Sequence, residues 1–126
     1  MNATELMIGD WVIVRRPSNL FEKLRVKSVI GNGTIEAKTR DGLVVFGELA
    51  VDPIPLTGEI LEKNGFAKKL DTDGLHYRFT LIGGYTWFSV RYVRSVFQWL
   101  GPLDFKYVHE LQHALRLSGI EKEIVL

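Results

Sequence analysis

The stretch from Leu24 to Thr39, LRVKSVIGNGTIEAKT, decides the fold class. On either side of its centre, small or apolar residues alternate with mostly polar ones, a period of two that is typical of β-strands with one buried face. Gly31-Asn32-Gly33 lies between the two runs and is a strong hairpin signal. The sequence therefore predicts an antiparallel hairpin here.

Two further short strands flank this hairpin. Residues 10–15 (DWVIVR) form a β-branched and aromatic run, and residues 43–46 follow the tight turn expected at Asp41-Gly42. Four short strands joined by tight turns predict a small curled meander of the SH3-like barrel kind over residues 5–52. The opening from Ile8 to Val12 is also similar to the first strand of such barrels.

A proline-rich link at residues 52–55 (DPIP) interrupts the strands, and a short helix is expected after it. Thr57 is the predicted N-cap, with Leu56 packing on Leu61 as a hydrophobic staple. Asn64-Gly65 is the predicted end, because glycine readily adopts the left-handed conformation that follows a helix.

The second half returns to β-structure. Residues 75–82 alternate, Gly83-Gly84 marks a two-residue turn, and residues 85–92 form the return strand. A third strand is expected at residues 96–100, stopped by Gly101-Pro102.

The longest helix is predicted last. Asp104 is its expected N-cap, and the helix runs to about Ser118 with Gly119 as its stop. Residues 124–126 form either an edge strand or a loose tail. The expected fold is α+β, mainly β, in a single domain (1–126). Its first part is the meander at 5–52; its second part, 53–126, holds the short helix and a hairpin sheet packed against the C-terminal helix.

Composition limits the function classes. A chain of 126 residues with 46% hydrophobic and 25% charged residues is long enough for one domain, or two very small subdomains. The net charge of +1 gives no global attraction to nucleic acid or to an anionic membrane. Cysteine is absent, which excludes disulfides, thiolate zinc sites and cysteine nucleophiles. We find neither a signal peptide nor a transmembrane run, and we expect a cytoplasmic protein that does not bind membranes.

One motif points to a specific chemistry. Residues 109–113 (HELQH) fit H-E-x-x-H, in which two histidines bind zinc and the glutamate is the general base of a hydrolase. A helical projection places His109 and His113 opposite the apolar residues Leu111 and Leu115, so we predict an exposed polar helix face and no cofactor. Two alternatives stay open. One is an incidental surface metal site; the other is a zinc hydrolase with Glu110 as base, for which His76 is a third ligand only by accident of folding.

The strongest charge bias lies between Trp11 and Gly47, where seven basic residues stand against three acidic ones. Its ordinary explanation is a solvated strand face. The alternative is a ligand-binding surface for nucleic acid or protein, made of Arg15, Arg16, Arg25, Lys27, Lys38 and Arg40.

The second β segment is rich in aromatic side chains, and alternation predicts that most of them are core beneath the helices. The alternatives are stacking of single-stranded nucleic acid beside Arg78, Arg91 and Arg94, or an interface of a homo-oligomer. The aromatic residues are Tyr77, Phe79, Tyr85, Trp87, Phe88, Tyr92, Phe97 and Trp99.

Three stretches together are similar to a known pattern: residues 5–12 (ELMIGDWV), residues 54–66 (IPLT with Leu61 and Gly65-Phe66), and residues 107–119 (YVHELQH with Leu117-Ser118-Gly119). In this order they resemble a group of uncharacterised small proteins of gut Bacteroidetes and their phages or mobile elements. That group has Gln and Asn at the positions of Glu110 and His113, which implies that its members are not H-E-x-x-H enzymes.

The leading hypothesis is therefore a non-enzymatic binding or adaptor module of bacterial or mobile-element origin. The alternatives are a zinc-dependent hydrolase, an SH3-like nucleic-acid-binding module and a structural homo-oligomer. Protein and nucleic acid are the expected partner classes.

Overall fold

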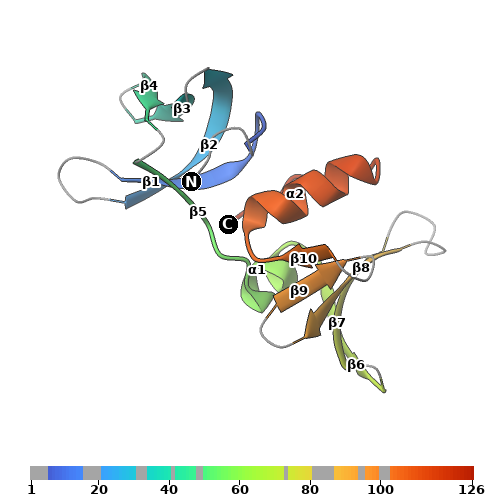
Figure 1. Cartoon of the computed structure of the whole chain (residues 1–126). Helices are drawn as coiled ribbons and strands as arrows, with labels where there is room; N and C mark the ends of the chain where they lie inside the picture. Colours follow the sequence, from blue (N-terminus) through green and yellow to red (C-terminus); the bar gives the residue numbers. More distant parts are fainter. Residues whose placement is uncertain are drawn as a thin grey trace. The chain divides into compact units, whose positions relative to one another are not determined.

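The computed structural model describes residues 6–15, 21–30, 34–40, 42–47, 50–72, 74–80, 87–93, 96–99 and 103–126. The chain divides into two compact units. The first comprises residues 1–54 and 107–113, and the second comprises residues 55–106 and 114–126. Each unit contains one five-stranded antiparallel sheet (Figure 1).

The first sheet has the order β4-β3-β2-β1-β5. Its strands are β1 (Trp11–Arg15), β2 (Phe21–Ile30), β3 (Thr34–Thr39), β4 (Gly42–Phe46) and β5 (Val51–Pro53). The first four confirm the strands predicted from the sequence. The Gly31-Asn32-Gly33 turn lies outside the described residues, whereas Gly42 has the positive φ of 104° that a tight turn before β4 requires. The described strands leave this sheet open, and no closed barrel is found among them.

The core of the first unit follows from the alternation. Val12, Val14, Val26, Ile35 and Ala37 are each at most 1% exposed and share one face of the sheet. Their neighbours along the strands point to the other face. A shift of register between Val26 and Ser28 marks a bulge in β2.

β5 corrects the sequence prediction, which treated residues 52–55 as a link. Val51, Asp52 and Pro53 pair with β1, and Pro53 stands opposite Val12. Proline cannot donate to a strand ladder, but β5 is the edge of the sheet and is paired on one side only. An edge position therefore allows a strand that local reasoning excludes.

The short helix is confirmed in detail. α1 spans Gly58–Lys63, and the hydroxyl of its N-cap Thr57 accepts a hydrogen bond from the Ile60 backbone N–H at 3.2 Å. Leu56 and Leu61, the predicted staple pair, are both buried. Asn64 is the C-cap, and Gly65 follows with a φ of 87°.

The second sheet has the order β10-β9-β8-β7-β6. Its strands are β6 (Ala67–Asp71), β7 (Gly74–Thr80), β8 (Trp87–Val93), β9 (Val96–Trp99) and β10 (Leu103–Phe105). The β7–β8 hairpin and β9 were predicted. β6 and β10 were not. The predicted turns at Gly83-Gly84 and Gly101-Pro102, and Tyr85, lie outside the described residues.

Asp104 does not cap the last helix, as the sequence predicted. It lies in β10 opposite Gln98, while Phe105 pairs with Phe97. α2 spans Val108–Leu117, and Gly119 follows it with a φ of 72°. The local pattern after Asp104 resembles a helix start, but pairing with β9 outweighs it. No helix in the described part of the chain is long and apolar enough to cross a membrane.

Candidate functional site

The entry into β1 is built around a buried carboxylate. Asp10 is fully buried, and backbone hydrogen bonds hold its loop on β2: Gly9 N–H donates to Val26 O, and Val26 N–H donates to Asp10 O, both at 2.8 Å. Gly9 has a φ of 92°, a backbone conformation that favours glycine. The hydrogen bonds to Val26 and the positive φ of Gly9 therefore define the backbone path of the Ile8-Gly9-Asp10-Trp11 opening.

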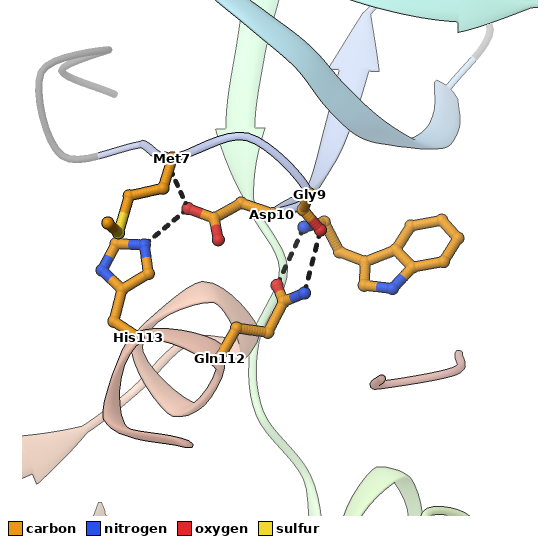
Figure 2. Close-up of polar contacts among 6 residues, drawn as sticks. Met7, Gly9, Asp10, Gln112 and His113 are labelled. Carbon is orange, nitrogen blue, oxygen red and sulfur yellow. Dashed lines mark hydrogen bonds and ion pairs between the residues drawn. The ribbon is translucent and has the colours of Figure 1, made fainter. Parts of the chain in front are cut away.

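Asp10 joins this loop to α2, as Figure 2 shows. One of its oxygens, Oδ2, accepts from the Met7 backbone N–H at 2.8 Å and lies 2.6 Å from Nε2 of His113. At this separation the carboxylate oxygen and the ring nitrogen share a hydrogen bond. His113 is thus engaged by a partner 103 residues earlier in the chain.

Gln112 makes the second connection. Its Oε1 accepts from the Trp11 backbone N–H at 2.9 Å, and its Nε2 donates to Gly9 O at 3.0 Å (Figure 2). One side-chain amide therefore satisfies two backbone groups at the start of β1, as a neighbouring strand would. No spacing in the sequence indicates this contact.

The exposed polar helix face expected around the HELQH motif is wrong. His109 is only 3% exposed and Gln112 only 7%, whereas Leu111 and Leu115 are buried as predicted, together with Val108 and Ala114. A helical projection assigns faces by hydropathy alone. Here Gln112 and His113 make specific hydrogen bonds to the β1 entry, and the His109 ring is buried beside Tyr107.

The motif residues are engaged in contacts within the first unit. Oε1 of Glu110 accepts from the Tyr107 backbone N–H at 3.0 Å, the contact of a capping box at a helix start. The His109 ring stacks on Tyr107 with centroids 5.9 Å apart, and the His109 and His113 centroids are 5.5 Å apart. His76 lies in β7, in the second unit. Among the described residues, no group of three His, Asp or Glu side chains is arranged to hold a metal ion.

The predicted basic surface is partly assembled on one face of the first sheet. The guanidinium of Arg25 lies over the Trp11 ring, 4.8 Å from its centroid, and Trp11 is paired with Arg25 across β1 and β2. Val26 pairs with Ala37, so Lys38 lies next to Arg25 on the adjacent strand, and Lys38 in turn pairs with Leu43. This row of four residues points away from the core, because the neighbours Val12, Val26 and Ala37 are buried.

The other predicted basic residues contribute differently. Arg15 forms an exposed ion pair with Asp52 at 3.1 Å. Lys27 is exposed at the β2 bulge, and Arg40 is exposed in the turn after β3. Arg16 lies outside the described residues. Sequence reasoning missed Lys23, which is exposed and pairs with Ile13, because its face is set by the register with β1.

The second sheet has its own outward polar face. Arg78 lies over the ring of Trp87, 4.4 Å from its centroid, and Trp87 is 51% exposed. His76 pairs with Arg91, which pairs with Gln98 on β9. Arg94 lies outside the described residues. The opposite face is the aromatic core that the sequence predicts, with Tyr77, Phe88 and Phe97 buried.

No protein-family model, curated protein or solved structure matches this chain.

Proposed function

We propose that this protein is a non-enzymatic binding module that contacts single-stranded nucleic acid through the outward face of its first sheet. The observation that carries the proposal is the row Trp11, Arg25, Lys38 and Leu43 across β1 to β4, with the guanidinium of Arg25 stacked on an indole. Arginine planes and aromatic rings stack with bases, and lysines contact phosphates.

The charges on this face support an anionic partner. Lys23 and Lys38 are exposed and form no ion pair with any described residue. The carboxylates of the same face are already engaged: Asp52 pairs with Arg15 at 3.1 Å, and Glu36 accepts from the Ser28 hydroxyl at 3.2 Å. A polyanion would therefore meet cations rather than carboxylates here. Exposed Leu43 and Val45 add apolar area beside the stack.

We also propose that the first unit is an SH3-like domain and that the protein belongs to the group of Bacteroidetes and phage proteins that its motifs resemble. The strand order, with β5 returning to pair with β1, supports the first proposal. The absence of cysteine supports a reducing compartment and hence the cytoplasm.

Zinc hydrolysis stays an untested alternative. It would require Glu110 and His113 to leave the contacts described above.

The test is fluorescence anisotropy with a labelled single-stranded 12-mer of mixed sequence at low salt. Arg25→Ala should weaken binding by about tenfold, the effect of losing one stacking partner. The double substitution of Lys23 and Lys38 by alanine should weaken it further, because two phosphate contacts are lost.

Lys122→Ala is the matched control, because it removes one positive charge from the second unit. It should change affinity by less than about twofold. Undetectable binding by the wild-type protein at low salt, or an equal loss from Lys122→Ala, would contradict a site on the first sheet. If a protein ligand competed with nucleic acid for this face, the proposed partner would be a protein instead of a nucleic acid.

A further inference from the structure

The second unit contains a cavity of about 380 Å³ on the aromatic side of its sheet. The apolar wall comes from Leu56, Leu75, Tyr92 and Phe97, with the Tyr92 and Phe97 rings 4.9 Å apart between centroids. This volume is ordinary for a small-molecule site, and the lining combines the aromatic pair with polar groups. All of its lining residues belong to the second unit.

Polar groups of different kinds also line this cavity. Lys68 on β6 is exposed at its rim and is the only charged residue among the described residues that line the cavity. Tyr77 is 5% exposed and lines the cavity, and its hydroxyl makes no hydrogen bond with any described residue. A tyrosine hydroxyl that lines a cavity can donate a hydrogen bond to water or to a ligand there.

Gly58, at the start of α1, also lines the cavity and allows the hydroxyl to lie there. A β-carbon at this position would overlap the oxygen of Tyr77. The Thr57 hydroxyl is already used, since it accepts the Ile60 N–H at 3.2 Å. The Tyr77 hydroxyl and the Lys68 ammonium are therefore the groups available to a ligand.

We infer that this cavity binds a small planar aromatic carboxylate. The ring system would lie against Tyr92 and Phe97, the Tyr77 hydroxyl would donate to a carboxylate oxygen, and Lys68 would balance its charge. A neutral or cationic ring would keep the stacking but lose the charge-assisted contacts. This site is independent of the nucleic-acid face proposed for the first sheet.

The experiment is a titration of the full chain with 2-naphthoate, followed by ¹⁵N–¹H NMR and calorimetry, beside the neutral 2-naphthamide and the cationic 2-naphthylmethylamine. Saturable binding of naphthoate is expected, with naphthamide weaker by about threefold or more. Lys68→Met should weaken naphthoate by about threefold without changing naphthamide. Tyr77→Phe, which keeps the ring, should weaken naphthoate by about fivefold.

Lys69→Met is the matched control. Lys69 is the next residue of β6 and pairs with His76 on the outward face, so this variant removes the same charge outside the cavity. The affinity of the Lys69→Met variant for naphthoate should equal that of the wild-type protein. The inference is overturned if naphthoate does not saturate the wild-type protein in the millimolar range, if naphthamide binds equally well, or if Lys69→Met loses as much as Lys68→Met. Unchanged NMR dispersion of each variant establishes that it is folded.

Discussion

At the scale of single residues, polar side chains of this protein replace missing backbone partners. Gln112 bonds the backbone of Gly9 and Trp11, and Asn64 does the same for Val125. Asp10 satisfies the Met7 N–H and engages His113. Each of these groups is buried or nearly so, where an unsatisfied polar group costs about 1–3 kcal/mol. Side chains that hydropathy would place in water therefore stabilise the fold.

His113→Ala tests the contact with Asp10. It should lower the free energy of unfolding by about 2 kcal/mol, because the fully buried carboxylate keeps one fewer donor. Urea denaturation measures this change. In a double-mutant cycle with Asp10→Asn, the combined loss should be smaller than the sum by about 1 kcal/mol.

Leu117→Ala is the control for this cycle. Leu117 is 82% exposed on the same helix, so its loss should change stability by less than about 0.5 kcal/mol. Equal effects of His113→Ala and Leu117→Ala would mean that the Asp10 contact contributes nothing.

These contacts define how far the candidate site could be predicted from residues. Arg25 and Lys38 were identified from charge bias alone, and the register then placed them side by side. Lys23 was missed because its position on this face depends on the register between β1 and β2, which the sequence alone does not give. The Asp10–His113 contact joins positions 103 apart, and no local pattern carries that information. The HELQH motif suggested metal chemistry at the position where the structure shows helix capping and docking.

At the scale of elements, prediction succeeded where the local signals were complete. α1 has its cap, its staple pair and its terminal glycine within ten residues, from Leu56 to Gly65; the structure shows the cap and the glycine, and both staple residues are buried. β5, β6 and β10 were missed because each depends on its neighbour: Pro53 reads as a breaker, Ala67–Asp71 is mostly polar, and Asp104 reads as a helix cap. Pairing with a neighbouring strand stabilises these short segments, although their own β-propensity is low.

Asn64 shows how one element also anchors another. Its Nδ2 donates to Ile60 O within α1 and to Val125 O, both at 2.7 Å, and its Oδ1 accepts from Val125 N–H at 2.7 Å. Residues 124–126 form no strand. Ile124 is nevertheless buried, with only 1% of its surface exposed. The tail is held by an amide side chain instead of a sheet.

Asn64→Ala should lower the free energy of unfolding by about 2 kcal/mol, since it leaves two groups of Val125 without their partner. Amide exchange at Val125 should accelerate more than exchange at the centre of β7. Glu62→Ala, an exposed position of the same helix, should change stability by less than about 0.5 kcal/mol. Slow exchange at Val125 in Asn64→Ala would show that the tail is held by other contacts.

At the scale of the whole molecule, the net charge of +1 conceals an uneven distribution. Long-range attraction of a polyanion is weak, so any affinity must come from local contacts on the face defined by Trp11, Arg25, Lys38 and Leu43. Exposed residues of both signs elsewhere contribute little at physiological salt.

The salt dependence of nucleic-acid binding should therefore be modest and local. Replacing Lys23 and Lys38 together by alanine should reduce the slope of log K against log salt by about one to two units, about 0.7 for each lost phosphate contact on a single strand. Anisotropy titrations at several salt concentrations measure this slope. An unchanged slope would place the phosphate contacts on another surface.

By itself the sequence determined the mainly β class, seven of the ten strands found in the described residues, the short helix with both caps, and the apolar face of α2. These features depend on residues close together in the chain, whose periodicity and turn chemistry act locally. Only the tertiary structure decided the strands β5, β6 and β10, the start of α2 and the burial of His109 and Gln112. Those outcomes depend on contacts between residues distant in the chain, as when the buried Gln112 side chain supplies partners to the backbone of Gly9 and Trp11.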